Sequence, residues 1–293
     1  MIHSILDNDL YKFTMQNAVM KLYPHSKVKY QFINRNTDNF PKGFGKALKK
    51  EITDFTLLQL TTEEEKFLWE KCYFFDPVYI DFLKGFRFDS NEVTIRQKGN
   101  KLIVNIEGFW YRTILWEVPI LSLISELYFE LTNKKIFRPE SIEKINISKA
   151  KKFEKLGAKF ADFGTRRRYS YQNHLSVVKT FKHFAPKSFI GTSNVHLAHK
   201  LKLTPIGTQA HEWFMFHAAK YGFTMANSIA LGRWVDIYHG NLGIALSDTF
   251  TSETFFDAFD TMYAKLFDGV RQDSGDPVEF AKDLVMHYKN LRI

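Results

Sequence analysis

The first hundred residues carry two kinds of hydrophobic pattern. Apolar residues recur at helical spacing over 9–22, whereas apolar and polar residues alternate over 28–33, as they do in a half-buried strand. Thr61 and Glu64 have the spacing of a capping box and predict a helix over 61–72. This part of the chain combines helices and strands without regular alternation, which is typical of α+β domains.

The next segments predict a β-hairpin, and the hydrophobic pattern changes after Gly108. Alternating segments at 92–97 and 101–107 flank Lys98-Gly99-Asn100, and a short link that contains glycine favours a hairpin. Beyond Gly108, helical segments alternate with short apolar segments, which indicates parallel βαβ units. We predict helices at 113–131, 142–156, 173–184, 195–200, 211–221, 251–266 and from Pro277 onward, and strands or strand-to-loop segments at 159–164, 189–192, 204–208, 242–248 and 269–273.

These patterns predict an α/β protein in two parts. We expect an α+β N-terminal domain at 1–110 and an irregular, barrel-like β/α domain at 111–293. The predicted strands are too few to close a regular eight-stranded barrel. Either the barrel is irregular, or a C-terminal part of the domain is missing.

Composition narrows the class of protein. With 45% hydrophobic and 16% aromatic residues, the chain can build a large core and is not disordered. It has no apolar run of about 18 residues and no basic-then-apolar leader, so we expect neither a membrane span nor secretion. The single cysteine, Cys72, excludes an intramolecular disulfide and fits a reducing compartment. We therefore expect a cytoplasmic protein.

The formal net charge of +9 could attract nucleic acids or small phosphorylated substrates. Most of the lysines are scattered at helical spacing and are most simply explained as solvated helix faces. Arg166-Arg167-Arg168 is the exception, since it lies within a motif. The sequence contains no recognisable nucleic-acid-binding motif. A basic, non-catalytic nucleic-acid-binding protein is nevertheless kept as an alternative.

Polar motifs follow four of the predicted strands. Because the carboxyl ends of parallel strands meet at one edge, we expect these motifs to form a ligand site. They supply arginines for phosphate or carboxylate, glycines that let backbone N–H groups approach an anion, and carboxylates for Mg²⁺ or a ribose hydroxyl. Each motif alone is more simply a turn or a helix N-cap, but together they favour a phosphate-handling enzyme. The motifs are Asp162-Phe163-Gly164-Thr165-Arg166, Gly191-Thr192-Ser193-Asn194, Gly207-Thr208-Gln209-Ala210-His211 and Arg271-Gln272-Asp273-Ser274-Gly275-Asp276-Pro277.

The imidazole of His211 is the most versatile group in these motifs. It could act as a base, a metal ligand or a nucleophile. His196 and His199 have a spacing that could bind a metal, but no HExxH or cysteine pattern accompanies them, so packing or solvated roles are favoured. His174, His217 and His239 have no assigned role, but His239 lies near the start of a predicted strand, where it could border the site.

With the opening segment Asp7-Asn8-Asp9-Leu10-Tyr11-Lys12-Phe13-Thr14-Met15, the four motifs closely resemble those of nicotinate phosphoribosyltransferases, in the same order from residue 7 to residue 277. The resemblance implies an ATP-coupled enzyme of NAD salvage that converts nicotinate and phosphoribosyl pyrophosphate into nicotinate mononucleotide and pyrophosphate. It also implies an α+β domain joined to an irregular barrel, and active sites shared within a homodimer. Family members are usually about a hundred residues longer, and loops expected to bind the 5-phosphate lie in that further part.

The resemblance also implies roles for the reacting groups. His211 matches the histidine that the family phosphorylates from ATP, for which a neutral imidazole is a competent nucleophile. Asp248 matches the acid that orients this histidine through its far ring nitrogen. Asp273 matches a residue near the ribose and its Mg²⁺.

Substrate-binding roles follow in the same way. Phe163 and Arg271 resemble the pair that sandwiches the pyridine ring, and Tyr11 resembles a tyrosine contributed by the neighbouring subunit. Positions that contact nicotinate or the phosphates are matched by Arg166, Ser193 and Thr208.

Ser193 also bears on the choice of substrate. The related nicotinamide enzyme has Asp at this position, which would accept from an amide but repel a carboxylate, whereas a serine can donate to nicotinate. We therefore predict nicotinate, with a nicotinamide-type enzyme as the alternative. A homologue with a dead site is disfavoured because His211, Asp248, Arg271 and Asp273 are all present.

Overall fold

The computed structural model describes residues 1–35, 39–134 and 139–293. Two compact units are formed, Met1–Ile206 and Gly207–Ile293, and each is described by itself. The predicted boundary at 110/111 lies inside the first unit and stays a prediction. In the described ranges, no helix has the length and apolar character needed to cross a membrane.

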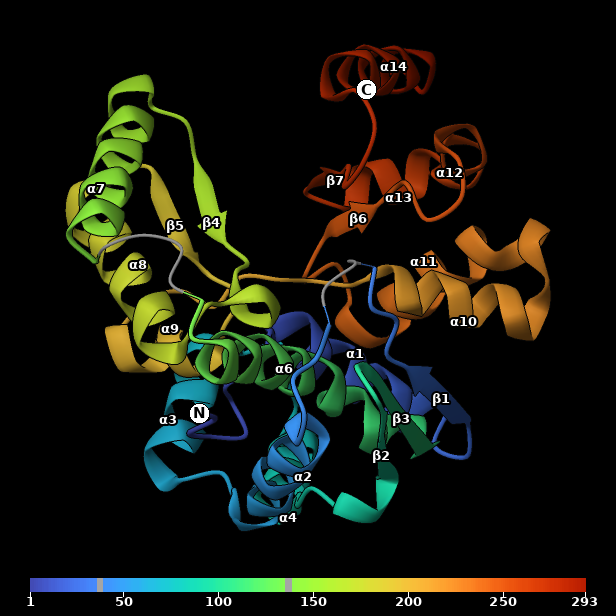
Figure 1. Cartoon of the computed structure of the whole chain (residues 1–293). Helices are drawn as coiled ribbons and strands as arrows, with labels where there is room; N and C mark the ends of the chain where they lie inside the picture. The colour runs from blue at the N-terminus through green and yellow to red at the C-terminus, as the bar shows by residue number, and fades with distance from the viewer. Residues whose placement is uncertain (36–38, 135–138) are drawn as a thin grey trace. The chain divides into compact units, whose positions relative to one another are not determined.

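The N-terminal part of the first unit combines helices with an antiparallel sheet, as predicted (Figure 1). The sheet has the order β1-β3-β2, and the predicted hairpin pairs Lys98 with Lys101 around Gly99. Thr61 and Glu64 form the predicted capping box at the start of α3. The elements are α1 (Leu10–Leu22), β1 (Lys27–Gln31), α2 (Phe44–Asp54), η1 (Phe55–Leu57), α3 (Thr62–Lys71), α4 (Pro77–Gly85), η2 (Ser90–Glu92), β2 (Val93–Lys98) and β3 (Lys101–Phe109).

The remainder of the first unit alternates helices with short parallel strands. The predicted helix at 113–131 is interrupted by a 3-10 turn before α6 begins at Glu117. Strands β4 and β5 pair in parallel, and α7 and α8 pack together on a core that includes Ala150, Val178 and Phe189. The elements are α5 (Trp110–Thr113), η3 (Ile114–Trp116), α6 (Glu117–Thr132), α7 (Pro139–Leu156), β4 (Phe160–Asp162), η4 (Thr165–Arg167), α8 (Tyr171–Phe184), β5 (Phe189–Thr192) and α9 (Val195–Leu201).

The predicted strand at 204–208 is wrong. The structure has one isolated parallel bridge there, between Thr192 and Pro205, made by the bonds from the Thr192 N–H to the Thr204 carbonyl over 3.3 Å and from the Ile206 N–H to the Thr192 carbonyl over 2.9 Å. The segment nevertheless passes very close to β5: a Cβ on Gly191 would lie 2.2 Å from the Thr204 carbonyl oxygen. Only a glycine at 191, with its φ of +149°, permits this approach.

The second unit continues the alternation, with two departures from prediction. A whole helix, α11, lies between the predicted helix at 211–221 and the strand β6. The predicted helix at 251–266 is two helices, because Asp260 caps a new N-terminus by accepting from the N–H groups of Met262 and Tyr263. Strands β6 and β7 pair in parallel. The elements are α10 (His211–Tyr221), α11 (Phe223–Tyr238), β6 (Ile244–Leu246), α12 (Ser252–Ala258), α13 (Thr261–Leu266), β7 (Gly269–Arg271) and α14 (Pro277–Asn290).

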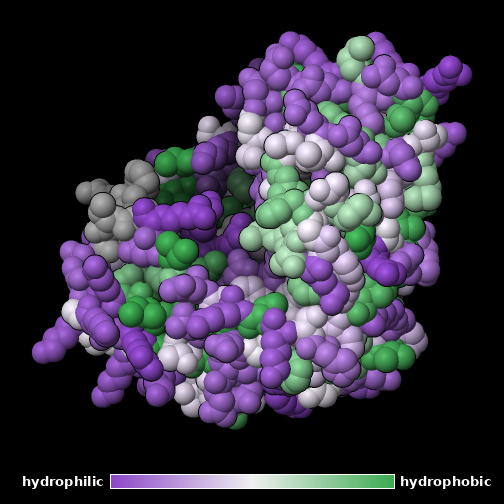
Figure 2. All heavy atoms as spheres, turned by 90° about the vertical axis from the view of Figure 1, so that its right-hand side faces the viewer, coloured by the Kyte–Doolittle hydropathy of each residue, from purple (hydrophilic) through white to green (hydrophobic). Residues whose placement is uncertain are grey.

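Hydrophilic residues cover most of the face seen in Figure 2, with apolar residues in smaller groups between them. Most of the large apolar side chains lie instead in the interior, where Trp110, Trp116, Trp213 and Trp234 are at most 1% exposed. This division is expected of a folded globular chain. The predicted class, an α+β segment followed by β/α units, is confirmed, and the parallel strands observed form two separate pairs.

Candidate active site

The first unit brings two of the predicted motifs together at the C-terminal ends of β4 and β5. Asp162 and Thr192 are paired in the parallel register, and the Thr192 hydroxyl donates to Asp162 Oδ2 over 2.6 Å. The Gly164 N–H donates to the other carboxylate oxygen over 3.0 Å. The motifs after these two strands are therefore neighbours, as the parallel arrangement predicts.

The N-terminal motif joins the same edge from the far end of the unit's sequence. The Leu10 N–H donates to the Ser193 carbonyl over 2.8 Å, and the Val195 N–H donates to the Asn8 carbonyl over 3.0 Å. Asp9 and Asn194 also form an isolated antiparallel bridge. The segment that opens the chain is thus built into the edge where the strand-end motifs lie.

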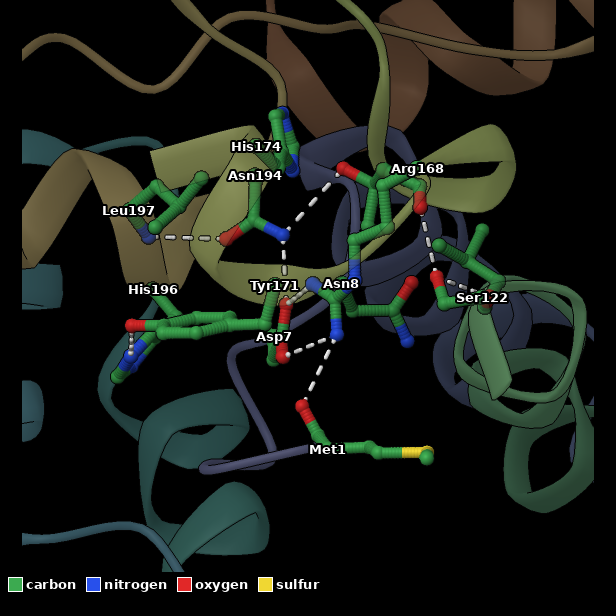
Figure 3. Close-up of polar contacts among 12 residues, drawn as sticks. Met1, Asp7, Asn8, Ser122, Arg168, Tyr171, His174, Asn194, His196 and Leu197 are labelled. Carbon is green, nitrogen blue, oxygen red and sulfur yellow. Dashed lines mark hydrogen bonds and ion pairs between the residues drawn. The ribbon is translucent and has the colours of Figure 1, made fainter. Parts of the chain in front are cut away.

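A buried ion-pair network centred on Arg168 fixes this assembly (Figure 3). Its guanidinium binds Asp7 at 2.7 and 3.1 Å and Glu126 at 2.6 Å, and Asn194 donates to Asp7 over 2.8 Å. Burial would raise the pKa of Asp7, but Arg168 and Asn194 outweigh it and hold that pKa below its ordinary value. Arg168 is only 4% exposed, so its charge is used within the protein rather than offered to a ligand.

Phe163 and Arg166, in contrast, face solvent. Phe163 is 47% exposed, so its ring is accessible to a ligand. Arg166 Nη1 lies 3.5 Å from Glu117 Oε1, and its side chain is 42% exposed. Both predicted substrate-binding residues are accessible at this edge. Burial would raise the pKa of Glu117, but Lys12 and Arg166 lower it below its usual range and keep the carboxylate charged.

Ser193 and Tyr11 lie deeper than their predicted roles require. Ser193 is fully buried, and its hydroxyl donates to Asp9 Oδ1 over 2.7 Å. A hydroxyl has one proton, so Ser193 could donate to a substrate carboxylate only after releasing Asp9. Tyr11 is 7% exposed, and burial together with the neighbouring Asp9 and Glu117 carboxyls raises the pKa of its phenol. Both roles stay predictions.

The second unit presents His211 as the first residue of α10. Its Nδ1 lies 3.1 Å from Thr249 Oγ1, and its Nε2 lies 3.3 Å from Asp273 Oδ2. A carboxylate beside Nε2 favours the tautomer with the proton there and leaves the lone pair on Nδ1. The side chain is 36% exposed. The imidazole is therefore oriented from both sides, and in this tautomer the Thr249 hydroxyl donates to Nδ1 and must turn away before that lone pair attacks a phosphate.

The acid beside His211 is Asp273, whereas Asp248 was predicted there. Asp248 Oδ2 instead accepts from the Asp273 N–H over 3.2 Å and from the Ser274 hydroxyl over 2.6 Å. Asp248 thus holds the loop that carries Asp273, because it follows β6 while that loop follows the paired strand β7. Its other oxygen, Oδ1, is buried without a hydrogen-bond partner in the described part of the chain.

Arg271 completes the group in the second unit. Its Nη2 lies 3.1 Å from Asp273 Oδ1, and its Nη1 donates to the Gln209 carbonyl over 3.3 Å. Burial would raise the pKa of Asp273, but Arg271 and His211 outweigh it and lower that pKa. Thr208 donates its hydroxyl to the Ile244 carbonyl over 3.1 Å and so helps to fix the turn before His211.

Several residues of these arrangements had no predicted role, and Thr249, Asp9 and His174 are three of them. Thr249 directly follows the predicted strand-end acid, so its place in the chain is a usable signal. Asp9 lies inside the N-terminal motif, but no sequence pattern predicts its hydrogen bond with Ser193. His174 bonds to Asp162, twelve positions away, which no sequence pattern indicates. No group of three or more His, Cys, Asp or Glu side chains converges as a metal site among the described residues.

Comparison with known proteins gives a consistent result. Residues 158–293 match the model of the nicotinate phosphoribosyltransferase (NAPRTase) family, and residues 6–125 match its N-terminal domain. The nicotinate phosphoribosyltransferase of Chromohalobacter salexigens is 53% identical over 293 residues, which are 100% of this chain and 75% of that protein. The crystal structure of the Porphyromonas gingivalis enzyme of that name has a TM-score of 0.97 at 42% identity, covering 100% of this chain and 75% of its own. The enzyme of that name from Vibrio cholerae has a TM-score of 0.93 at 32% identity, with 100% and 71% covered.

Proposed function

The chain belongs to the nicotinate phosphoribosyltransferase family, and we propose that it makes nicotinate mononucleotide from nicotinate and phosphoribosyl pyrophosphate. The pyridine nitrogen would supply its lone pair to C1 of the ribose, and the C–O bond to pyrophosphate would break as pyrophosphate leaves with the electron pair. The exposed Phe163 and Arg166 support this proposal, because an aromatic face and a guanidinium suit a pyridine carboxylate.

We further propose that ATP hydrolysis is coupled through His211. The imidazole lone pair would form an N–P bond to the γ-phosphorus while the bond to ADP breaks, and water would later cleave the labile phosphoramidate. The observation that carries this step is the exposed His211 ring, held between Thr249 and Asp273. Asp273 would stabilise the positive charge that develops on the ring.

Mg²⁺ would enter with the substrate phosphates and neutralise part of their charge. The donors near His211 fit a hard cation, because Asp248 and Asp273 supply carboxylate oxygens and Asp248 Oδ1 is buried without a hydrogen-bond partner in the part of the chain described. These two residues are the ones that would hold it.

The proposal includes the substrate, the assembly and the compartment. Arg166 favours the carboxylate of nicotinate over the neutral amide of nicotinamide, which is the alternative substrate. We also propose that the protein is a homodimer with shared active sites. It would act in the cytoplasm and would bind no nucleic acid. Light scattering of the purified chain measures the assembly, and a monomer with full activity would contradict shared sites.

The decisive experiment follows both products and the enzyme-bound phosphate. Purified protein with nicotinate, phosphoribosyl pyrophosphate and Mg-ATP is expected to yield nicotinate mononucleotide, and less without ATP. Brief incubation with Mg-ATP should leave an acid-labile, base-stable phosphate on His211. His211→Ala should abolish this label and reduce ATP-dependent turnover by roughly 100-fold. His287→Gln, whose amide can still donate to the Phe259 carbonyl, serves as a matched control on the same unit. Continued acceleration by ATP in His211→Ala would contradict the phosphohistidine.

A further inference from the structure

Asp162 and His174 form a buried pair that the proposed reaction leaves without a role. His174 is 4% exposed, and its Nε2 lies 2.8 Å from Asp162 Oδ2. Thr192 donates to the same oxygen, and the Gly164 N–H donates to Oδ1. One carboxylate therefore joins the ends of β4 and β5, the helix α8 and the turn that follows β4.

Phe163 stands in the middle of this turn. The bond from Gly164 to Asp162 spans it, and such a turn fixes the backbone of the residue that it encloses. Since the ring is 47% exposed, its direction depends on this backbone more than on side-chain packing. The turn also lies against the pair: a Cβ on Gly164 would be 3.0 Å from Asp162 Oδ1 and 3.5 Å from His174 Nε2.

Because Asp162 is a buried carboxylate, the geometry of the turn depends on the groups that donate hydrogen bonds to it. Burial would raise the pKa of the carboxyl, but His174, Thr192 and Gly164 together hold it below the ordinary value. A buried carboxylate that loses one of these donors turns toward other donors or toward water. Removing His174 would therefore release the turn without touching any residue that faces the substrate.

We propose that the His174–Asp162 pair is a positioning device that fixes Phe163 against the pyridine substrate. The proposal rests on the proposed function for the identity of that substrate and for the role of Phe163 as the ring that stacks on it. His174 acts through Asp162 and the turn, so its loss is expected to weaken pyridine binding selectively. Loss of one aromatic stacking contact weakens binding by up to roughly tenfold.

Steady-state kinetics of His174 variants test the selectivity. In His174→Ala, the KM for nicotinate is expected to rise about tenfold, with kcat changed less than threefold and the KM for phosphoribosyl pyrophosphate unchanged. In His174→Gln, the amide can donate from nearly the position of Nε2 and should restore most of the loss. His183→Ala, at an exposed histidine of the same helix, is the control. Equal losses in the Ala and Gln variants, or an unchanged KM in folded His174→Ala, would overturn the proposal.

Hydrogen exchange gives a readout that does not require activity. The amide of Gly164 donates to Asp162, so His174→Ala should speed its exchange at least tenfold, while amides of the β3 strand stay unchanged. An unchanged Gly164 amide would overturn the positioning role even in an active enzyme. If the wild type turns over no nicotinate but the Gly164 amide exchanges faster in His174→Ala, the proposed function is wrong. The role of the His174–Asp162 pair in fixing the turn is then still supported.

Discussion

The strand ends of the two units are built in opposite ways. In the first unit, Asp7, Asn194 and Ser193 are fully buried, and each bonds to another side chain across the edge. In the second unit, the side chains of His211 and Asp273 are 36% and 51% exposed. A buried polar network holds its residues in one geometry, and breaking it lowers the stability of the fold. Exposed groups, in contrast, can rearrange around a reacting phosphate. Substitutions in the buried network of the first unit should therefore act mainly on stability, whereas substitutions of His211 or Asp273 should act on chemistry.

Arg168→Leu should have the largest effect on stability. It leaves the Asp7 and Glu126 carboxylates buried without their cation, which is expected to lower the free energy of unfolding by about 3–5 kcal/mol. Urea denaturation measures the loss, and Arg167→Leu, at the exposed neighbouring arginine, is the control. A loss below about 1 kcal/mol would mean that the network is dispensable and that the two strand ends differ less than their burial indicates.

Asp273→Asn and Asp248→Asn separate the two acids of the second unit. If direct contact orients His211, Asp273→Asn should slow formation of the enzyme-bound phosphate by roughly 100-fold, and Asp248→Asn by roughly tenfold. Asp273→Asn should lower the free energy of unfolding by less than about 1 kcal/mol, because its side chain is 51% exposed. Rapid-quench labelling with Mg-ATP measures the rates. A larger effect of Asp248→Asn than of Asp273→Asn would show that Asp248 orients His211, as the family resemblance implies.

Asp7 and Asp9 provide the finest test, since their pKa values move in opposite directions. Burial raises the pKa of Asp9 despite hydrogen bonds from Thr165 and Ser193, so its charge costs stability above that pKa. Asp9→Asn should stabilise the protein by about 1 kcal/mol at pH 7, and the gain should vanish as the pH falls below the raised pKa.

Asp7→Asn should instead destabilise the protein at pH 7. The lowered pKa of Asp7 contributes stability that is present above the unfolded value of 3.8 and is lost as the pH falls through the folded pKa. Thermal unfolding of both variants between about pH 2 and pH 8 checks the signs, because the Asp7 contribution is lost only below the unfolded pKa of 3.8. Destabilisation by Asp9→Asn at pH 7 would show that the Asp9 carboxylate is better compensated than its burial indicates.

The sequence predicted the elements whose signals are local. The capping box at Thr61, the hairpin around Gly99 and the helix that starts at His211 each depend on neighbouring residues, and each is confirmed. The strand-end motifs were found for the same reason. Their adjacency within the first unit follows from one rule about parallel strands.

The errors have physical causes that a single sequence does not reveal. At 204–208 an apolar segment pairs with β5 only through Thr192, and the sequence does not show where the segment turns away from that strand. The helix at 251–266 breaks because Asp260, which could have lain on a helix surface, caps a second helix instead. The partners of Ser193 and Asp248 depend on side chains brought together by tertiary structure, so motif membership placed these residues near a site without showing what they bind.

The bonds between the opening segment and β5 also have a consequence for synthesis. Ser193 lies 184 positions after its partner Asp9, so nearly the whole first unit must leave the ribosome before that pairing can form. At usual rates of elongation, the segment waits roughly ten to forty seconds with Asp7 and Asp9 in water. Because contacts of such long sequence separation form late, the edge that carries Phe163 and Arg166 is expected to be among the last parts of the first unit to become ordered on a growing chain.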